Sequence, residues 1–135
     1  MTLAALFLSA LLFGGMVLYS FGFAPLVFAQ LPGDQAGRVI RGAFPWYYLF
    51  VLGVALVAGA VLAAVDPRGA GLMLAVAGLA VIARQVLMPM INRARDAQLA
   101  GDAAAKRRFG QLHGLSVLIN FAQLFAVAWV LARFI

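Results

Sequence analysis

The sequence predicts an all-α integral membrane protein folded as an antiparallel four-helix transmembrane bundle. Of its 135 residues, 66% are hydrophobic and only 10% are charged, whereas a soluble domain carries about a quarter charged residues. Four long segments hold almost no charge: residues 1–33, 42–65, 69–92 and 109–132. A helix needs roughly 20 residues to cross the hydrocarbon core. We therefore expect a single domain, residues 1–135, with spans at about 3–30, 44–65, 70–91 and 109–132.

The first segment is expected to remain as a span rather than to act as a cleaved signal peptide. Its start, MTLAALFLSALLFGG, has no basic residue, and the apolar run exceeds the usual 7–15 residues of a signal core. Gly22 and Pro25 predict a kink near its inner end, because proline removes one helical hydrogen bond and clashes with the preceding turn. Leu26–Leu31 would then lie along the membrane surface or under the bundle. A broken helix lining a binding cavity is the alternative.

The connections between the next spans predict the orientation. Loops 31–42 and 92–108 fall on one side and carry seven basic residues: Arg38, Arg41, Arg93, Arg95, Lys106, Arg107 and Arg108. The other connection, DPRG at 66–69, reads as a tight turn. The positive-inside bias places the two basic loops in the cytoplasm and both termini outside. We expect a multi-pass protein of the cell membrane, specifically a bacterial inner membrane. Within the second basic loop, Gly101-Asp102 predicts a break and an N-cap, so the fourth helix would begin near Asp102.

The fourth span carries a polar stripe made of His113, Ser116, Asn120 and Gln123. Steps of three and four residues place these side chains on one helix face. Lipid cannot form hydrogen bonds with them, so the stripe should face the bundle interior. Two interpretations stay open: hydrogen bonds that join helices, or a ligand pocket. For His113, the only histidine, the functional versions are a metal or haem ligand and a proton carrier.

Other polar residues lie at the same depth, near the basic end. Arg84 either snorkels to the interface or faces inward and binds an anionic group. The aromatic residues that open the second span also fit the aromatic belt of any membrane protein. The candidate ligand-binding residues are His113, Ser116, Asn120, Gln123, Arg84, Gln85, Tyr48 and Ser20.

Composition restricts the chemistry. Met88 and Met90 lie level with His113, and thioether and imidazole ligands suit Cu(I), so these three are the candidate metal ligands; apolar packing is the other interpretation. The chain has no cysteine or glutamate and no phosphate-binding loop, so we assign no catalytic residue and do not favour an enzyme. The net charge of +6 comes from the loops, so the expected partners are the lipid bilayer and a homo-oligomer or larger membrane complex, not nucleic acid.

The two halves of the chain show a faint echo of each other. Pro25 and Pro89 each precede a basic loop, and Phe44 and Phe109 each open a span. Aligning the phenylalanines places Tyr48 opposite His113. The echo fits parallel repeats about an axis along the membrane normal, although any pair of adjacent helices can produce it.

Four segments resemble a known family: GFAPLVFAQLP, AGRVIRGAFPWYY, NRARD and RFGQLHGLSVLIN. They are similar to the transmembrane protein 205-like family, known in bacteria as domain of unknown function 4149, from about Gly14 to Gln123. The resemblance implies a four-span membrane protein without a settled activity. More distantly, the layout is similar to four-span copper-resistance proteins and a small haem-dependent oxidase of porphyrin synthesis. The single histidine and the absence of lysine in the spans depart from those ligand patterns.

Three functional hypotheses follow from these patterns. The first is a non-enzymatic membrane protein that binds or passes a small ligand or ion at the polar pocket on the cytoplasmic side. The second is an accessory or structural subunit of a larger membrane complex, which the short chain and minimal loops suggest. The third is a haem- or copper-binding membrane protein.

Overall fold

Helices account for nearly all of residues 2–135, which are the residues that the computed structural model describes. In chain order they are α1 (Leu3–Val17), the π-helical turn η1 (Leu18–Phe23), α2 (Ala24–Gln30), α3 (Gly33–Leu62), α4 (Pro67–Ile82), the π-helical turn η2 (Ala83–Leu87), α5 (Met88–Leu99) and α6 (Ala103–Ala132). Within the described chain they join into four continuous helices long and apolar enough to cross a membrane: Leu3–Gln30, Gly33–Leu62, Pro67–Leu99 and Ala103–Ala132. The prediction of an all-helical protein with four candidate spans is confirmed.

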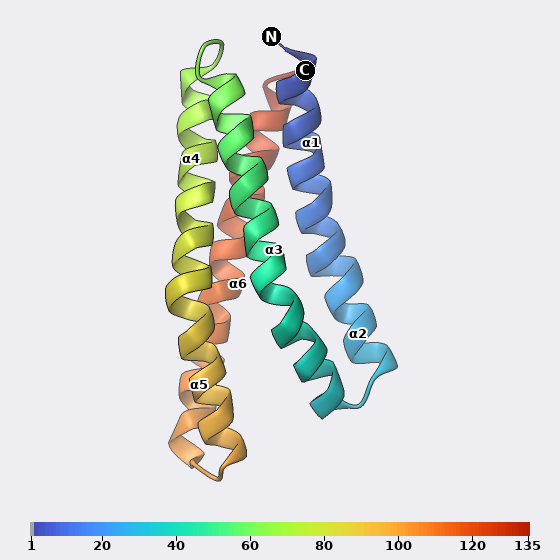
Figure 1. Cartoon of the computed structure of the whole chain (residues 1–135), viewed down its shortest axis with the longest axis vertical. Helices are drawn as coiled ribbons and strands as arrows, with labels where there is room; N and C mark the ends of the chain where they lie inside the picture. Colours follow the sequence, from blue (N-terminus) through green and yellow to red (C-terminus); the bar gives the residue numbers. More distant parts are fainter. Residues whose placement is uncertain (1) are drawn as a thin grey trace.

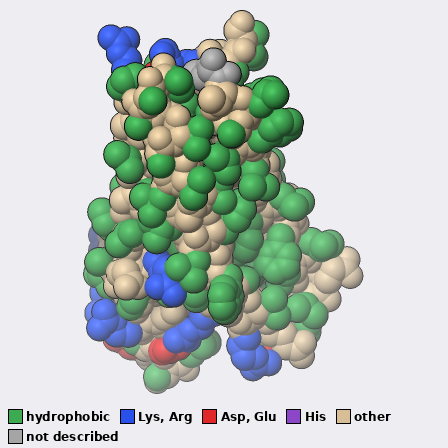
Figure 2. Space-filling view, turned by 45° about the horizontal axis from the view of Figure 1, so that its top comes forward, with side chains coloured by type: hydrophobic (Ala, Val, Ile, Leu, Met, Phe, Trp, Pro, Cys, Tyr) green, Lys and Arg blue, Asp and Glu red, His purple; other side chains and the backbone are tan. Residues whose placement is uncertain are grey.

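The four long helices form a bundle whose two ends differ (Figure 1). Both termini and the α3–α4 turn lie at the upper end, and the α2–α3 and α5–α6 connections lie at the lower end. The core runs through the upper part and contains fully buried side chains from all four helices, among them Leu12, Met16, Val51, Met73, Val76 and Val127. A separate small cluster of Val27, Ala36 and Ile40 joins α2 to the start of α3. Figure 2 shows apolar side chains over the middle of the molecule and charged side chains at both ends, with the larger group at the lower end.

The predicted loop 31–42 is wrong, because α3 already begins at Gly33. The sequence there has the pattern of an amphipathic helix. Ala36 and Ile40 are four residues apart and buried, while Asp34 and Arg38, also four apart, form an exposed ion pair at 3.9 Å. Packing against α2 therefore extends this helix by more than two turns beyond the apolar segment.

The predicted loop 92–108 is also mostly helical, since α5 continues to Leu99 and α6 starts at Ala103. The break predicted at Gly101-Asp102 is confirmed. Gly101 has a φ of +100°, a backbone conformation that favours glycine. The Asp102 carboxylate accepts a hydrogen bond of 3.0 Å from the Ala104 N–H and so caps α6.

The first long helix absorbs Pro25 through a π-helical turn. The Ala24 N–H bonds to the Tyr19 carbonyl, five residues back, and α2 then continues to Gln30 alongside α3. A π turn is wider than an α turn, and so relieves the clash of the proline ring with the preceding turn. The third helix repeats the arrangement, which the sequence analysis did not predict: the Met88 N–H bonds to the Ala83 carbonyl immediately before Pro89.

An ion pair joins two distant parts of the chain at the upper end. Arg133, just after α6, donates to Asp66, just before α4, through Nε at 2.6 Å and Nη2 at 3.0 Å. The Asp66 carboxylate is buried, and a Cβ on Gly69 would lie 2.6 Å from its Oδ2, so only glycine fits there without a shift. The Arg133 guanidinium holds the pKa of the Asp66 carboxyl below its usual range.

Replacing Asp66→Asn is expected to lower the thermal stability of the purified protein at neutral pH. Because the folded-state pKa of Asp66 is depressed, its stabilising contribution is complete above the unfolded pKa of about 3.9 and is lost as the pH falls through the folded value. The variant should therefore lose much of the acid-side fall in unfolding temperature. The fluorescence of Trp129, whose ring lies 4.7 Å from the Arg133 guanidinium, reports the transition.

The control is Asp34→Asn, which breaks an ion pair whose side chains are 75% and 73% exposed and should change the unfolding temperature little. Equal effects of the two substitutions would contradict the assignment.

Candidate functional site

A hydrogen-bonded chain of side chains crosses the bundle below its core. The Tyr47 hydroxyl donates to Asn120 Oδ1 at 2.6 Å, and Asn120 Nδ2 donates to Ser20 Oγ at 3.0 Å. The Tyr19 ring stacks on Tyr47 with centroids 4.2 Å apart. Both ends of the Asn120 amide are thus satisfied, and α3, α6 and η1 are tied together. The sequence analysis included Ser20 and Asn120 among the candidate ligand-binding residues, but not Tyr47.

Gln123 occupies the deepest position of the predicted stripe. It is 1% exposed, and its Nε2 donates to the Val76 carbonyl of α4 at 2.9 Å. This bond uses the side chain to join two helices, which is the structural interpretation of the stripe. The side-chain amides of Asn120 and Gln123 therefore both donate hydrogen bonds to other helices.

His113 and Ser116 lie at the wall of a cavity of about 40 Å³ between α3, α5 and α6. The cavity has room for roughly three water molecules. Ser116 donates to the His113 carbonyl at 2.7 Å, and the His113 ring stacks on Phe109 at 5.9 Å, so the imidazole nitrogens are not used by these contacts. The complete lining is Arg41, Phe44, Tyr48, Met88, Ile91, Asn92, His113 and Ser116. Three predicted ligand-binding residues, Tyr48, His113 and Ser116, therefore meet here, and so do two of the three predicted metal ligands, His113 and Met88.

An ion pair stands beside this cavity. Arg41 of α3 donates to Asp96 of α5 through Nη1 at 2.7 Å and Nη2 at 3.1 Å. The sequence analysis assigned Arg41 to a loop and did not include it in the site. The spacing of Arg41, Phe44 and Tyr48 places all three on one face once α3 is known to start at Gly33. The same spacing relates Met88 to Asn92, another residue of the lining that was missed.

Arg84 and Gln85 do not belong to the cavity of His113. Arg84 Nε donates to the Pro45 carbonyl at 3.4 Å and its Nη1 donates to Gln85 Oε1 at 3.2 Å. Arg84 lies within the π turn η2, which ends just before Met88, so the usual alignment of residues four apart does not hold between them. Arg84 is brought to α3, but on another face of the third helix.

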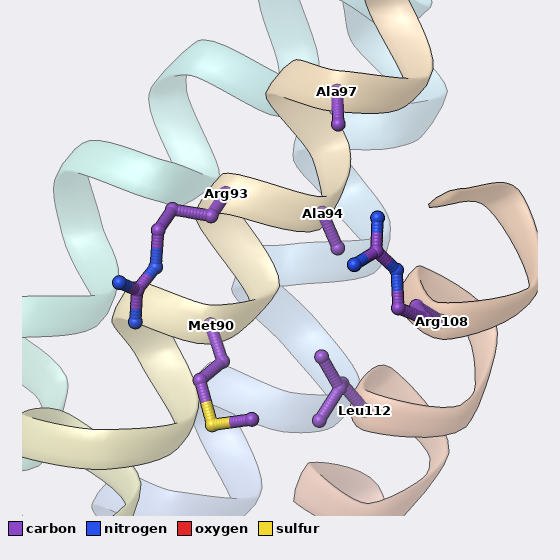
Figure 3. Close-up of a pocket in the computed structure, with 6 residues that line it drawn as sticks. All are labelled: Met90, Arg93, Ala94, Ala97, Arg108 and Leu112. Atoms are coloured by element: carbon purple, nitrogen blue, oxygen red, sulfur yellow. The ribbon is translucent and has the colours of Figure 1, made fainter. Parts of the chain in front are cut away.

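The structure does not bring the three candidate metal ligands together. Met88 lines the cavity of His113, whereas Met90 lines a second cavity of about 380 Å³ on another face of α5 (Figure 3). Residues two apart on an α-helix point to different sides, which accounts for the separation. Across residues 2–135, no group of three or more His, Cys, Asp or Glu side chains is arranged to hold a metal ion.

Comparison with known proteins identifies the family of this chain. The model of a domain of unknown function, DUF4149, matches residues 7–100. The chain belongs to the DUF4149 family. No curated protein and no solved structure matches it. The match covers Ser20, Tyr48 and Met88 of this DUF4149 chain, whereas the polar stripe of α6 lies beyond it.

The two halves of this DUF4149 chain use equivalent positions to contact each other. Ser20 precedes Pro25 by five residues, and Arg84 precedes Pro89 by the same number. Each side chain, held in a π turn, reaches the second long helix of the other half: Ser20 bonds Asn120 of α6, and Arg84 bonds the carbonyl of Pro45 of α3. These contacts add to the similarity between the two halves that the sequence shows.

The bond between Tyr47 and Asn120 is expected to appear as a coupling in a double-mutant cycle. Tyr47→Phe and Asn120→Ala should each destabilise the DUF4149 protein, with a coupling of about 0.6–2 kcal/mol measured by reversible unfolding in detergent micelles. The matched control pairs Asn120→Ala with Tyr48→Phe. The neighbouring Tyr48 hydroxyl makes no hydrogen bond to Asn120, so these two effects should add; a coupling of equal size would contradict the assignment.

Proposed function

We propose that this DUF4149 protein is an antiparallel four-span protein of a cell membrane that binds a small ion or small polar ligand at its basic end. The proposed site is the cavity between α3, α5 and α6. The basic end would face the cytoplasm, with both termini outside. We also infer a relation to transmembrane protein 205-like proteins, supported by the four segments that resemble that family.

One observation carries the proposal. In the part of the chain that the structure describes, the Tyr48 hydroxyl, the Asn92 amide and the His113 imidazole make no hydrogen bond to other protein groups, although all three line one cavity. Asn120 and Gln123, only a few turns away, are bonded to other helices. Polar groups within a bilayer need a partner, because lipid offers none. Tyr48 is buried, whereas the His113 side chain is exposed, so solvent water or a bound ligand is the partner that remains.

The size and chemistry of the cavity define the ligand class. A volume of about 40 Å³ is far below the roughly 300–1,000 Å³ of sites for drug-sized molecules. Hydroxyl, amide and imidazole groups can donate hydrogen bonds to a small inorganic anion. The Met88 thioether and the His113 imidazole could instead hold Cu(I), which favours soft ligands. Both ligands are small enough, and the imidazole is expected to contact either one.

The single histidine permits a direct test. In protein labelled with ¹³C and ¹⁵N at histidine and placed in lipid nanodiscs, one imidazole signal is expected. We expect it to shift saturably with one of two probes, chloride or Cu(I) under reducing conditions. Tyr48→Phe should weaken the response to chloride about 3- to 10-fold, since one hydrogen bond is worth about 0.5–1.5 kcal/mol. Met88→Leu should weaken the response to Cu(I).

The control is Gln111→Ala, which removes an exposed polar side chain of α6 that does not line the cavity. It should leave both responses unchanged. A folded protein whose His113 signal responds to neither probe would contradict the proposal. A Soret band retained through purification and lost in His113→Ala would replace it with the haem hypothesis.

The proposed orientation can be tested with single introduced cysteines, since the chain has no cysteine of its own. Ile135→Cys at the upper end should react with a membrane-impermeant maleimide in intact cells, and Ala104→Cys at the lower end should react only after permeabilisation. Both positions are exposed, so both should react once the membrane is opened. The reverse pattern would contradict the orientation.

A further inference from the structure

We propose that the larger cavity, between α5 and α6, binds the phosphate headgroup of an anionic phospholipid. The cavity measures about 380 Å³ and is lined by Met90, Arg93, Ala94, Ala97, Arg108 and Leu112 (Figure 3). It shares no residue with the cavity of His113. The inference rests on the membrane placement in the proposed function, but it does not depend on the ligand site proposed there.

The lining combines two cations with an apolar floor. Figure 3 shows Met90 and Leu112 at one end of the cavity and the Arg108 guanidinium beside Ala94, with the Arg93 guanidinium on the other side of the α5 ribbon. Ala94 and Ala97 are small and leave the space open between the helices. A molecule that fits both parts must carry negative charge at one end and hydrocarbon next to it. Phospholipids with net negative charge are the membrane components with that chemistry.

The two arginines make few ion pairs or hydrogen bonds within the protein. Among residues 2–135, Arg93 is exposed and makes no ion pair or hydrogen bond, and Arg108 has only a 3.5 Å contact with Asp102. The two arginine pairs that join distant parts of the chain are shorter, at 2.7 Å for Arg41 with Asp96 and 2.6 Å for Arg133 with Asp66. A phosphate offers planar guanidinium groups the bidentate hydrogen bonds that these two arginines lack.

The position of the cavity matches the depth of a headgroup. Met90 belongs to the apolar segment that ends at Asn92, and Arg93 follows immediately. On α6 the order is the same from the other direction, with Arg108 next to the apolar segment and Leu112 one turn inside it. Both helices thus pass from arginine to apolar side chain at the same level, as a lipid does from phosphate to acyl chain.

The test is lipid binding to the full-length protein in a neutral detergent, followed by native mass spectrometry. Phosphatidylglycerol should bind saturably to the wild-type protein, and phosphatidylcholine should bind at least tenfold more weakly. Arg93→Gln/Arg108→Gln should reduce the affinity for phosphatidylglycerol about tenfold or more. Lys106→Gln/Arg107→Gln removes the same charge from exposed positions outside the cavity and should change the affinity less than twofold.

Equal losses in the two double variants would overturn the proposal, because they would show general attraction to a basic surface. Inorganic phosphate that competes with phosphatidylglycerol at equal affinity would also overturn it, in favour of a free-anion site. If the arginine variant fails to fold, Ala97→Leu provides a second test, since it fills the cavity without a change of charge. This substitution should also weaken the binding of phosphatidylglycerol at least tenfold, and unchanged binding would contradict the proposed site.

Discussion

The scarcity of hydrogen-bonding partners around apolar helices is the constraint from which the rest of this structure follows. It makes the chain helical over nearly its whole length, because helices satisfy their own backbone groups. Two sets of polar side chains in the bundle meet this constraint differently. Asn120 and Gln123 are bonded to other helices and act as fixed points of the packing. Tyr48, Asn92 and His113 surround a small space instead, and that difference, rather than polarity alone, separates a candidate site from structural hydrogen bonding.

Proline interrupts the hydrogen bonds of two helices and so shapes the contacts between the two halves of the bundle. Pro25 and Pro89 each remove a helical N–H, and each is preceded by a π turn. The wide turns carry Ser20 and Arg84, the two side chains that contact the opposite half of the bundle. The same disturbance therefore recurs in both halves and serves the same structural purpose, although one half uses a hydroxyl and the other a guanidinium.

The features that the sequence predicted are those encoded locally. Long apolar segments predicted the helices, and Gly101-Asp102 predicted the start of α6. The spacing from His113 to Gln123 predicted an inward stripe, and Asn120 and Gln123 do contact other helices, whereas His113 is exposed. The features that it missed depend on partners distant in the chain. From the sequence alone, residues 33–42 resemble a polar loop, because their helix depends on the packing of Val27 against Ala36 and Ile40. Asp96 and Arg41 are 55 residues apart, so their spacing carried no signal of an ion pair.

The two ends of the bundle are held together by different interactions. The upper end has the continuous apolar core and the pair of Asp66 with Arg133, whose carboxylate is buried. The lower end has a separate small cluster and the pair of Arg41 with Asp96, whose side chains are 47% and 56% exposed. An exposed pair competes with water and is screened by salt, so it opens more readily than a buried one. Arg41 also lines the cavity of His113, so this exposed pair lies at the edge of that cavity.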